Sequence, residues 1–300
     1  MKNLMKIFLV TAILCAFISA PAMAAKKVTV GGKNYTEQYI LAEMAKQLLE
    51  NEGFEVESKT GVGSAVARKS LANGQIDLYY EYTGTAYTVF YKKKNTEIMT
   101  NPDKCYNWVK EADAKKGLVW LEPLNFNNTY TLMMRKDDAE SKGIKSISDL
   151  ADYIKQNPGE IKFGIDTEFY QRPDGFKKLM KAYNFRVRRS NIKLMSIGLT
   201  YMALKEKEVS SAMGFSTDGR IPSFGFINLV DNKNFFPVYN PAPVVRKEVL
   251  EKYPEIRDIL KPLTKKLTTK EIQKLNALVD IKHKDIKEAV TDWLKANKLI

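Results

Sequence analysis

Residues 78–87 read Leu-Tyr-Tyr-Glu-Tyr-Thr-Gly-Thr-Ala-Tyr and place four tyrosines, one carboxylate and a glycine turn at the end of a predicted strand. The alternation of Ile76, Leu78 and Tyr80 predicts that strand. In open α/β sheets, ligands bind beyond the carboxyl ends of the strands. Aromatic faces that converge there can hold a cation without N–H groups, such as a quaternary ammonium. The alternative is that these tyrosines are ordinary core, and the stretch alone leaves both interpretations open.

A strand, a turn and a helix precede this stretch. Val28–Val30 predicts a strand that two glycines break, and apolar residues at helical spacing then continue until Gly53. Asn34 and Glu37 have the spacing of a capping box at the start of that helix. Since a helix N-terminus presents free N–H groups, the turn over residues 31–38 is a natural place to receive a polar or anionic ligand group.

A second unit of the same kind contains part of a dinucleotide fingerprint. Phe54 and Val56 mark its strand, and Gly61 and Gly63 follow with the spacing that begins a Rossmann phosphate loop. The third small residue of that fingerprint is replaced by Val66. We therefore expect these glycines to shape a tight turn into a helix, and we expect no cofactor.

Strand and helix signals continue through the second half of the chain. Tyr130–Arg135 predicts a strand that leaves the first set of units, and a second set of α/β units follows it. The strands of this second set are predicted at residues 161–165, 192–195 and 209–213. Prolines mark an extended return segment at residues 236–245. The chain thus crosses between the two sets near residues 129–132 and 239–244, which predicts two hinged lobes with a cleft between them.

The N-terminus has the pattern of a secretory signal peptide. Lys2 and Lys6 precede an apolar run that is short for a membrane span, and Ala22 and Ala24 provide the small residues that a signal peptidase requires. We expect cleavage after Ala24 and a periplasmic location. Cys105 is then the single thiol of the mature chain, so no intramolecular disulfide is expected.

The net charge of +13 does not indicate a nucleic-acid-binding protein. The lysines are dispersed along the chain except at residues 92–94, and exported proteins seldom meet nucleic acid. Solvated helix faces and attraction to an anionic membrane surface explain the charge more simply. His283 is the only histidine in the sequence, so we expect no metal site.

Five short segments occur in a characteristic order along the chain. They are Gly31-Gly32-Lys33-Asn34-Tyr35-Thr36-Glu37-Gln38, Glu81-Tyr82-Thr83-Gly84-Thr85, Asn127-Asn128-Thr129-Tyr130, Arg172-Pro173-Asp174-Gly175 and Ser216-Thr217-Asp218-Gly219-Arg220. Together they resemble the substrate-binding proteins of osmoprotectant ABC transporters, the glycine betaine, carnitine and choline binding family. The resemblance spans roughly Lys26 to the C-terminus. It implies an α/β protein with the type II periplasmic-binding-protein fold, in which two α/β lobes joined by two hinge crossings close on the ligand.

The resemblance also implies a division of the chain and a set of partners. With a signal peptide at residues 1–24, we expect lobe 1 at residues 25–131 and 240–300 and lobe 2 at residues 132–239. Such a protein is not an enzyme. It delivers a quaternary-ammonium solute, such as glycine betaine, choline or carnitine, to separate membrane permease subunits, and we expect it to be a monomer.

In that family an aromatic box encloses the trimethylammonium group of the ligand. The matching positions here are Tyr82, Tyr130 and Tyr239, while Phe215 stands where relatives commonly have tyrosine. Phenylalanine keeps the π face and loses the hydroxyl, so the identity of the ligand stays open.

Other positions match the groups that hold the polar end of the ligand. These are Arg172, Thr85, Lys33 and Gln38, with Tyr170 as a further wall. A guanidinium offers a bidentate fork to a carboxylate, which suits Arg172 for this role. The residues alone also allow the alternative that Arg172 and Lys33 are solvent-exposed.

Two other functions are compatible with parts of the pattern. An exported hydrolase of the same fold would need two carboxylates that face one cleft, and Glu81 and Asp218 are the candidates. A binding protein for another small solute, such as an amino acid, would need an acidic partner for an α-ammonium group. The sequence leaves open which compatible solute is preferred.

Overall fold

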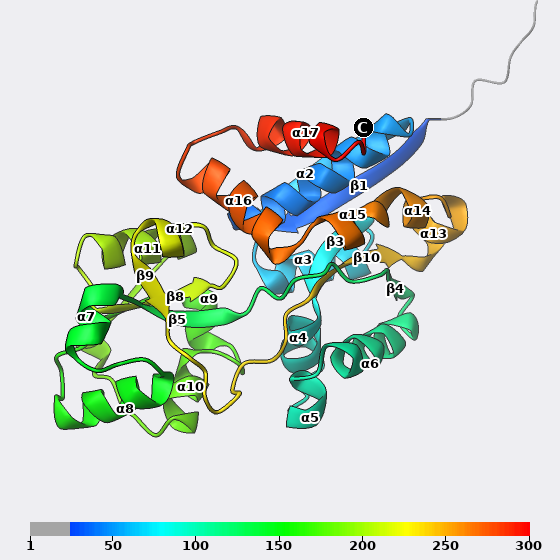
Figure 1. Ribbon diagram of the computed structural model, residues 1–300. Helices are drawn as coiled ribbons and strands as arrows, with labels where there is room; N and C mark the ends of the chain where they lie inside the picture. Colours follow the sequence, from blue (N-terminus) through cyan, green and yellow to red (C-terminus); the bar gives the residue numbers. More distant parts are fainter. Residues whose placement is uncertain (1–24) are drawn as a thin grey trace, which may run out of the picture.

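The computed structural model describes residues 25–300, which form two α/β lobes (Figure 1). The predicted signal peptide lies outside the described residues. We call the part built around the first sheet lobe 1 and the part built around the second sheet lobe 2. No helix among residues 25–300 has the length and apolar character that crossing a membrane requires.

The sheet of lobe 1 has the strand order β2-β1-β3-β10-β4. Its strands are β1 (Lys26–Lys33), β2 (Phe54–Val62), β3 (Leu78–Tyr82), β4 (Leu118–Trp120) and β10 (Pro241–Arg246). β1 is parallel to β2 and β3, whereas β10 is antiparallel to β3 and β4. The strand that returns from lobe 2 is therefore inserted beside the strand that carries Tyr82.

The sheet of lobe 2 has the corresponding order β7-β6-β8-β5-β9. Its strands are β5 (Tyr130–Arg135), β6 (Phe163–Asp166), β7 (Ile192–Met195), β8 (Ser211–Phe215) and β9 (Phe226–Asn228). β6 is parallel to β7 and β8, and β5, the first strand after the crossing from lobe 1, is antiparallel to β8 and β9. In each lobe, the first strand after a crossing therefore runs antiparallel to its neighbours.

Helices cover both sheets. In lobe 1 they are α2 (Thr36–Asn51), α3 (Ser64–Ala72), α4 (Thr83–Thr85), the π-helix at Ala86–Phe90, α5 (Thr96–Met99), α6 (Pro102–Ala114), α13 (Lys247–Lys252), α14 (Ile256–Leu260), α15 (Pro262–Lys266), α16 (Thr269–Asp280) and α17 (Ile286–Ala296). In lobe 2 they are α7 (Lys136–Ser141), α8 (Ile147–Gln156), α9 (Thr167–Gln171), α10 (Phe176–Ala182), the 3₁₀ helix at Arg189–Asn191, α11 (Ile197–Lys205) and α12 (Arg220–Ser223).

Strand β3 is buried on both faces. Leu78 and Tyr80 pack in the cluster that contains α2 and the C-terminal helices, whereas Tyr79 packs with α3 and α6 on the other face. Figure 1 shows α2, α16 and α17 gathered on one side of this sheet and α6 away from them. Because successive side chains of a strand point to opposite faces, the tyrosines of β3 pack into the apolar layers on both faces of the sheet, and the strand ends at the cleft.

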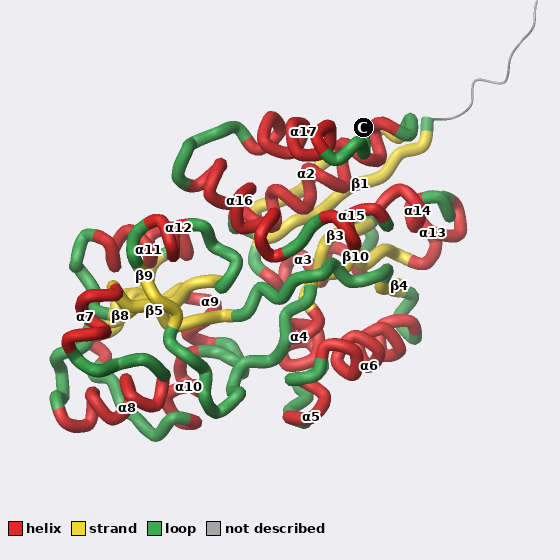
Figure 2. The backbone as a smooth tube through the Cα atoms, viewed as in Figure 1, coloured by secondary structure: helices red, strands yellow, loops and turns green. Residues whose placement is uncertain are grey.

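The two predicted crossings are confirmed. The chain leaves lobe 1 between β4 and β5 and returns between β9 and β10, and Figure 2 shows both connections as loops between the sheets. The lobe boundaries at residues 131/132 and 239/240 stay a prediction. Strands β5 and β7 have the predicted bounds.

The start of helix α2 differs from the prediction. Strand β1 does not break at the two glycines but continues to Lys33, with an irregularity between Gly31 and Lys33. The N-cap of α2 is Tyr35, without a side-chain cap, so the predicted capping box of Asn34 and Glu37 is wrong. The Glu37 carboxylate accepts hydrogen bonds from buried side chains instead, which a sequence pattern within one turn cannot reveal.

Gly175 provides a stability test for the loop that carries Arg172. A Cβ atom at this position would lie 1.9 Å from the Phe169 backbone oxygen, so the loop cannot accept a side chain without moving. We expect Gly175→Ala to lower the free energy of unfolding by about 1–3 kcal/mol, the usual cost of overpacking. Gly198→Ala is the control, because a Cβ there has 3.6 Å to its nearest neighbour, Arg220. Equal denaturant midpoints for the two variants would contradict the prediction.

Candidate ligand-binding site

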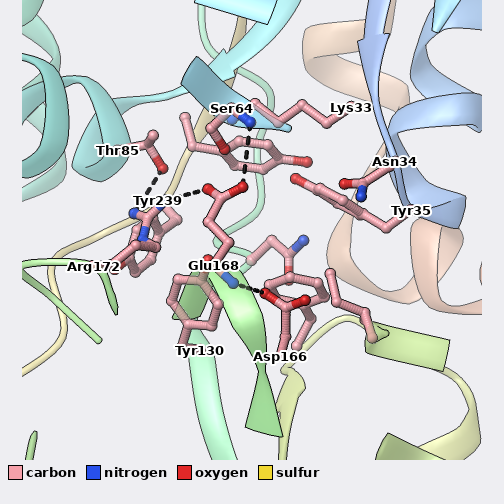
Figure 3. A pocket seen from close by; sticks show the side chains of 14 residues that line it. Lys33, Asn34, Tyr35, Ser64, Thr85, Tyr130, Asp166, Glu168, Arg172 and Tyr239 are labelled. Atoms are coloured by element: carbon pink, nitrogen blue, oxygen red, sulfur yellow. Dashed lines mark hydrogen bonds and ion pairs between the residues drawn. The ribbon is translucent and has the colours of Figure 1, made fainter. Parts of the chain in front are cut away.

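A cavity of about 490 Å³, including its mouth, lies between the two lobes (Figure 3). Strands of both sheets end beside it, so residues from each lobe line it. The lining residues are Lys33, Asn34, Tyr35, Ser64, Tyr82, Thr85, Asn128, Tyr130, Asp166, Glu168, Arg172, Ile197, Phe215 and Tyr239.

Five aromatic rings form a continuous wall around this cavity. The ring centroid of Tyr35 lies 6.4 Å from that of Tyr82 and 4.9 Å from that of Phe215. The ring centroid of Tyr130 lies 5.2 Å from that of Phe215 and 5.4 Å from that of Tyr239. The strand register explains one of these contacts, because Tyr130 of β5 pairs directly with Phe215 of β8. Such a wall offers several π faces to a cation that has lost its water.

Buried carboxylates hold two of these tyrosines from behind. The hydroxyl of Tyr82 donates to Glu37 at 2.7 Å and accepts from the Gln38 amide at 3.1 Å. The hydroxyl of Tyr239 donates to Asp174 at 2.8 Å. Since each hydroxyl is hydrogen-bonded to a buried carboxyl group, the rings have defined orientations before any ligand arrives.

Glu37 is the centre of the polar layer behind the rings. Besides Tyr82, it accepts hydrogen bonds from Asn128 at 2.8 Å and from Thr217 of lobe 2 at 2.6 Å. Burial raises the pKa of Glu37 to about 7, although the hydrogen bonds from Thr217, Tyr82 and Asn128 oppose this shift. This carboxyl group therefore titrates near neutral pH and links the lobes directly.

Arg172 lines the cavity, but its fork is occupied. Its Nε and Nη2 atoms each lie 2.7 Å from an oxygen of Asp174. Its remaining N–H groups reach Glu168 at 3.2 Å and Thr85 of lobe 1 at 3.3 Å. The guanidinium also lies 5.2 Å from the centroid of the Tyr130 ring. Asp174 in turn accepts from Thr88 of lobe 1 at 2.8 Å, so this ion pair also spans the lobes.

Lys33 is paired in the same way. Its ammonium lies 2.6 Å from Glu81, and that carboxylate also accepts from the Tyr79 hydroxyl at 2.6 Å. Lys33 is 2% exposed and Arg172 is 5% exposed, so the alternative that these two side chains are solvent-exposed is wrong. The Lys33 ammonium also lies 5.0 Å from the centroid of the Tyr82 ring.

The cavity brings together most of the positions that the resemblance indicated. Those that line it are Lys33, Tyr82, Thr85, Tyr130, Arg172, Phe215 and Tyr239. Gln38 is not among the lining residues, because its amide lies behind the wall and bonds to Tyr82 and to the Tyr80 carbonyl. Tyr170 does not line the cavity either, and its ring instead lies 4.5 Å from the Lys177 ammonium.

Several lining residues were not predicted, although signals for them existed. Tyr35 lies in the turn at residues 31–38, and Ser64 follows the glycine turn before α3. Asp166 and Glu168 come directly after strand β6, where ligand groups are expected in an α/β sheet. Asn128 belongs to the segment Asn127-Asn128-Thr129-Tyr130, one of the five that carry the family resemblance. The short helix α9, which carries Glu168, had no periodic pattern to reveal it.

The carboxylates proposed for a hydrolase do not face this cavity. Glu81 is fully buried against Lys33, and Asp218 is bonded to Arg220 at 2.9 Å. Each carboxylate therefore has a cationic partner, and neither lines the cavity. Among residues 25–300, no group of three His, Cys, Asp or Glu side chains has the arrangement of a metal site.

The fold and the site together define a class of protein. Two α/β lobes that are joined by two crossings, each with one antiparallel strand in its sheet and with an aromatic cavity between them, are typical of two-lobed solute-binding proteins. Residues 26–296 match the family model described as the substrate binding domain of ABC-type glycine betaine transport systems. The chain belongs to this family, whose members are binding proteins and not enzymes.

Individual relatives agree with this assignment. A glycine-betaine-binding protein of Pseudomonas aeruginosa is 38% identical over 292 residues, which cover 95% of this chain and 93% of that protein. The structure of apo YehZ from Escherichia coli is 32% identical, covers 92% of this chain and all of that one, and superposes with a TM-score of 0.67. A crystal structure of a glycine betaine/carnitine/choline ABC transporter protein is 29% identical over 91% of this chain and 99% of that one, with a TM-score of 0.73. The predicted type II fold is thereby confirmed.

The raised pKa of the Glu37 carboxyl group predicts that the stability of the protein depends on pH. The native protein holds this proton up to about pH 7, whereas the ordinary pKa is 4.5. As the pH rises from 4.5 to about 7, Glu37 ionises in the unfolded chain but not yet in the native protein. The contribution of Glu37 to the free energy of unfolding therefore falls by on the order of 1–3 kcal/mol over this range, and it stays constant above about pH 7.

Denaturant unfolding of the wild type and Glu37→Gln between pH 4.5 and 8 measures this contribution. Glutamine preserves the size of the side chain but does not titrate, so the difference between the two curves should shift over this pH range. Glu50→Gln removes an exposed carboxylate from the same helix and is the control. A difference between wild type and Glu37→Gln that is the same at all pH values would refute the assignment.

Proposed function

We propose that this protein binds a quaternary-ammonium compatible solute in the cleft and delivers it to an ABC permease. The observation that carries the proposal is the wall of five aromatic rings, Tyr35, Tyr82, Tyr130, Phe215 and Tyr239, in a cavity that both lobes close. A trimethylammonium group has no N–H to donate, so π faces are the contacts that can replace its water. Membership of the glycine betaine transport family supports the same ligand class.

The polar end of the ligand would lie toward the other side of the cavity. Thr85, Lys33 and Arg172 are the side chains proposed to contact it, with Asn34 and Ser64 nearby. Gln38 acts from behind the wall in this proposal, because it holds the Lys33 backbone N–H and the Tyr82 hydroxyl. Phe215 contributes its ring only, so no hydrogen bond to the ligand comes from that position.

Binding and closure form one event in this mechanism. The ligand contacts both lobes, so it stabilises the closed arrangement relative to an open one, and the permease recognises the closed form. We propose that the lobes comprise residues 25–131 with 240–300 and residues 132–239, that the permease is a separate membrane protein, and that the binding protein is a periplasmic monomer exported by a cleavable signal peptide.

A second candidate function is a binding protein for an amino acid. Asp166 and Glu168 line the cavity and could accept hydrogen bonds from an α-ammonium group. That function would use the same cleft and the same closure, and it differs from the first only in the ligand.

Calorimetric titration separates these two candidates. We expect saturable binding of at least one of glycine betaine, choline, carnitine and proline betaine, and no comparable binding of glycine or L-proline, which lack the quaternary ammonium. Thermal shifts with the same ligands provide a second measurement. Heat with the amino acids alone would favour the second candidate, and no response to any of the four quaternary amines would refute the first.

Tyr82→Ala tests the aromatic wall. Removal of the ring takes away a desolvated cation–π contact, so the affinity for the best quaternary amine should fall by about 1–2 kcal/mol or more. Tyr170→Ala is the matched control, because that ring does not line the cavity and its removal should leave the affinity unchanged. Equal affinities of Tyr82→Ala and the wild type would exclude Tyr82 from the ligand contacts.

A further inference from the structure

The centre of the cleft already contains a carboxylate of the chain itself. Glu168 of lobe 2 extends into the cavity, and Figure 3 shows it between Ser64 and Arg172. One carboxylate oxygen accepts from the Ser64 backbone N–H at 3.3 Å, and the other lies 3.2 Å from Nη1 of Arg172. Ser64 is the first residue of helix α3, so Glu168 occupies the positive end of that helix.

These are the groups that a carboxylate on a ligand would need. A helix N-terminus and a guanidinium fork are the usual receptors for such an anion in a protein. Here the helix N-terminus and one N–H of Arg172 bind Glu168, and Asp174 takes the bidentate face of the same guanidinium. A ligand carboxylate would have to displace Glu168 or approach it closely.

The second cation of the site is no more available. Lys33 lies 2.6 Å from Glu81, whose side chain is fully buried and cannot turn away to water. Separating this pair would leave a buried carboxylate without its cation, which is strongly unfavourable. Lys33 therefore neutralises Glu81 before it can neutralise a ligand.

The balance of charge around the cavity is negative. Its lining contains the cations Lys33 and Arg172 and the carboxylates Asp166 and Glu168, and each cation has a further buried carboxylate partner, Glu81 or Asp174. Two cations thus face four carboxylates. Although burial opposes its ionisation, the charge of Arg172 lowers the pKa of Glu168, so this group is ionised at neutral pH.

We propose that the preferred ligand carries a net positive charge, has no carboxylate, and directs a hydrogen-bond donor such as a hydroxyl toward Glu168. This inference rests on the proposed function, because it assumes that the aromatic wall encloses a quaternary ammonium. The excess of carboxylates attracts the cation, and Glu168 accepts the hydroxyl proton. A zwitterion would bring its own carboxylate against Glu168, and two like charges at this range repel strongly in a site with little water.

Choline and glycine betaine provide the test, since both carry a trimethylammonium group and one ends in a hydroxyl where the other ends in a carboxylate. Titration calorimetry at pH 7.5 would compare them on the wild type, Glu168→Gln and Glu111→Gln. Glutamine at position 168 keeps the shape of the side chain and its acceptor for the Ser64 N–H, but it removes the charge. Glu111 is exposed on helix α6, so its replacement changes the net charge equally without touching the cleft.

We expect the wild type and Glu111→Gln to bind choline at least about tenfold more tightly than glycine betaine, and Glu168→Gln to reduce that preference by about tenfold. Wild-type protein that binds glycine betaine as tightly as choline would overturn the inference while leaving the proposed function intact. An unchanged preference in a folded Glu168→Gln variant would also overturn it. Wild-type protein that binds neither amine would also overturn the inference, and the proposed function would be refuted only if carnitine and proline betaine failed to bind as well.

Discussion

The closed cleft depends on three buried carboxylates, Glu37, Glu81 and Asp174. Each accepts a hydrogen bond from a tyrosine hydroxyl, and the tyrosines are Tyr82, Tyr79 and Tyr239 respectively. A buried charge is tolerated only when it is hydrogen-bonded or paired, so each carboxylate restricts the positions of its neighbours. The walls of the cavity are consequently held from behind by these hydrogen bonds.

The same carboxylates join the lobes. Glu37 of lobe 1 accepts from Thr217 of lobe 2, and Asp174 of lobe 2 accepts from Thr88 of lobe 1. Opening the cleft would expose both carboxylates to water, which can solvate them. The cost of burying these groups must then be offset on closure by the contacts between the lobes and by the ligand. This arrangement explains physically why ligand binding and closure should be coupled.

The fold and the ligand are determined by different parts of the molecule. Membership of the glycine betaine transport family rests on the family model that matches residues 26–296 and on the similarity to relatives over most of the chain, and the strand order of the two sheets agrees with it. The choice among quaternary amines depends on a few groups at the polar end of the cavity, above all Glu168 and the pairs of Arg172 and Lys33. A shared fold therefore leaves the solute open, because side chains in the site decide it.

Local sequence signals were sufficient to predict several strands and the end of one of them. The strands at Tyr130–Arg135 and Ile192–Met195 follow from apolar and β-branched residues over a few positions, and the motif with Tyr82 marks the end of β3. The contacts between polar side chains, in contrast, depend on how distant segments of the chain pack together. Glu37 has the spacing of a capping residue, yet Asn128 and Thr217, which are distant in the chain, bind its carboxylate. Arg172 was predicted as a receptor for a ligand carboxylate, but Asp174 and Glu168 already hold its guanidinium. Partners like these are fixed by desolvation and charge in three dimensions, and no periodic pattern along the chain records them.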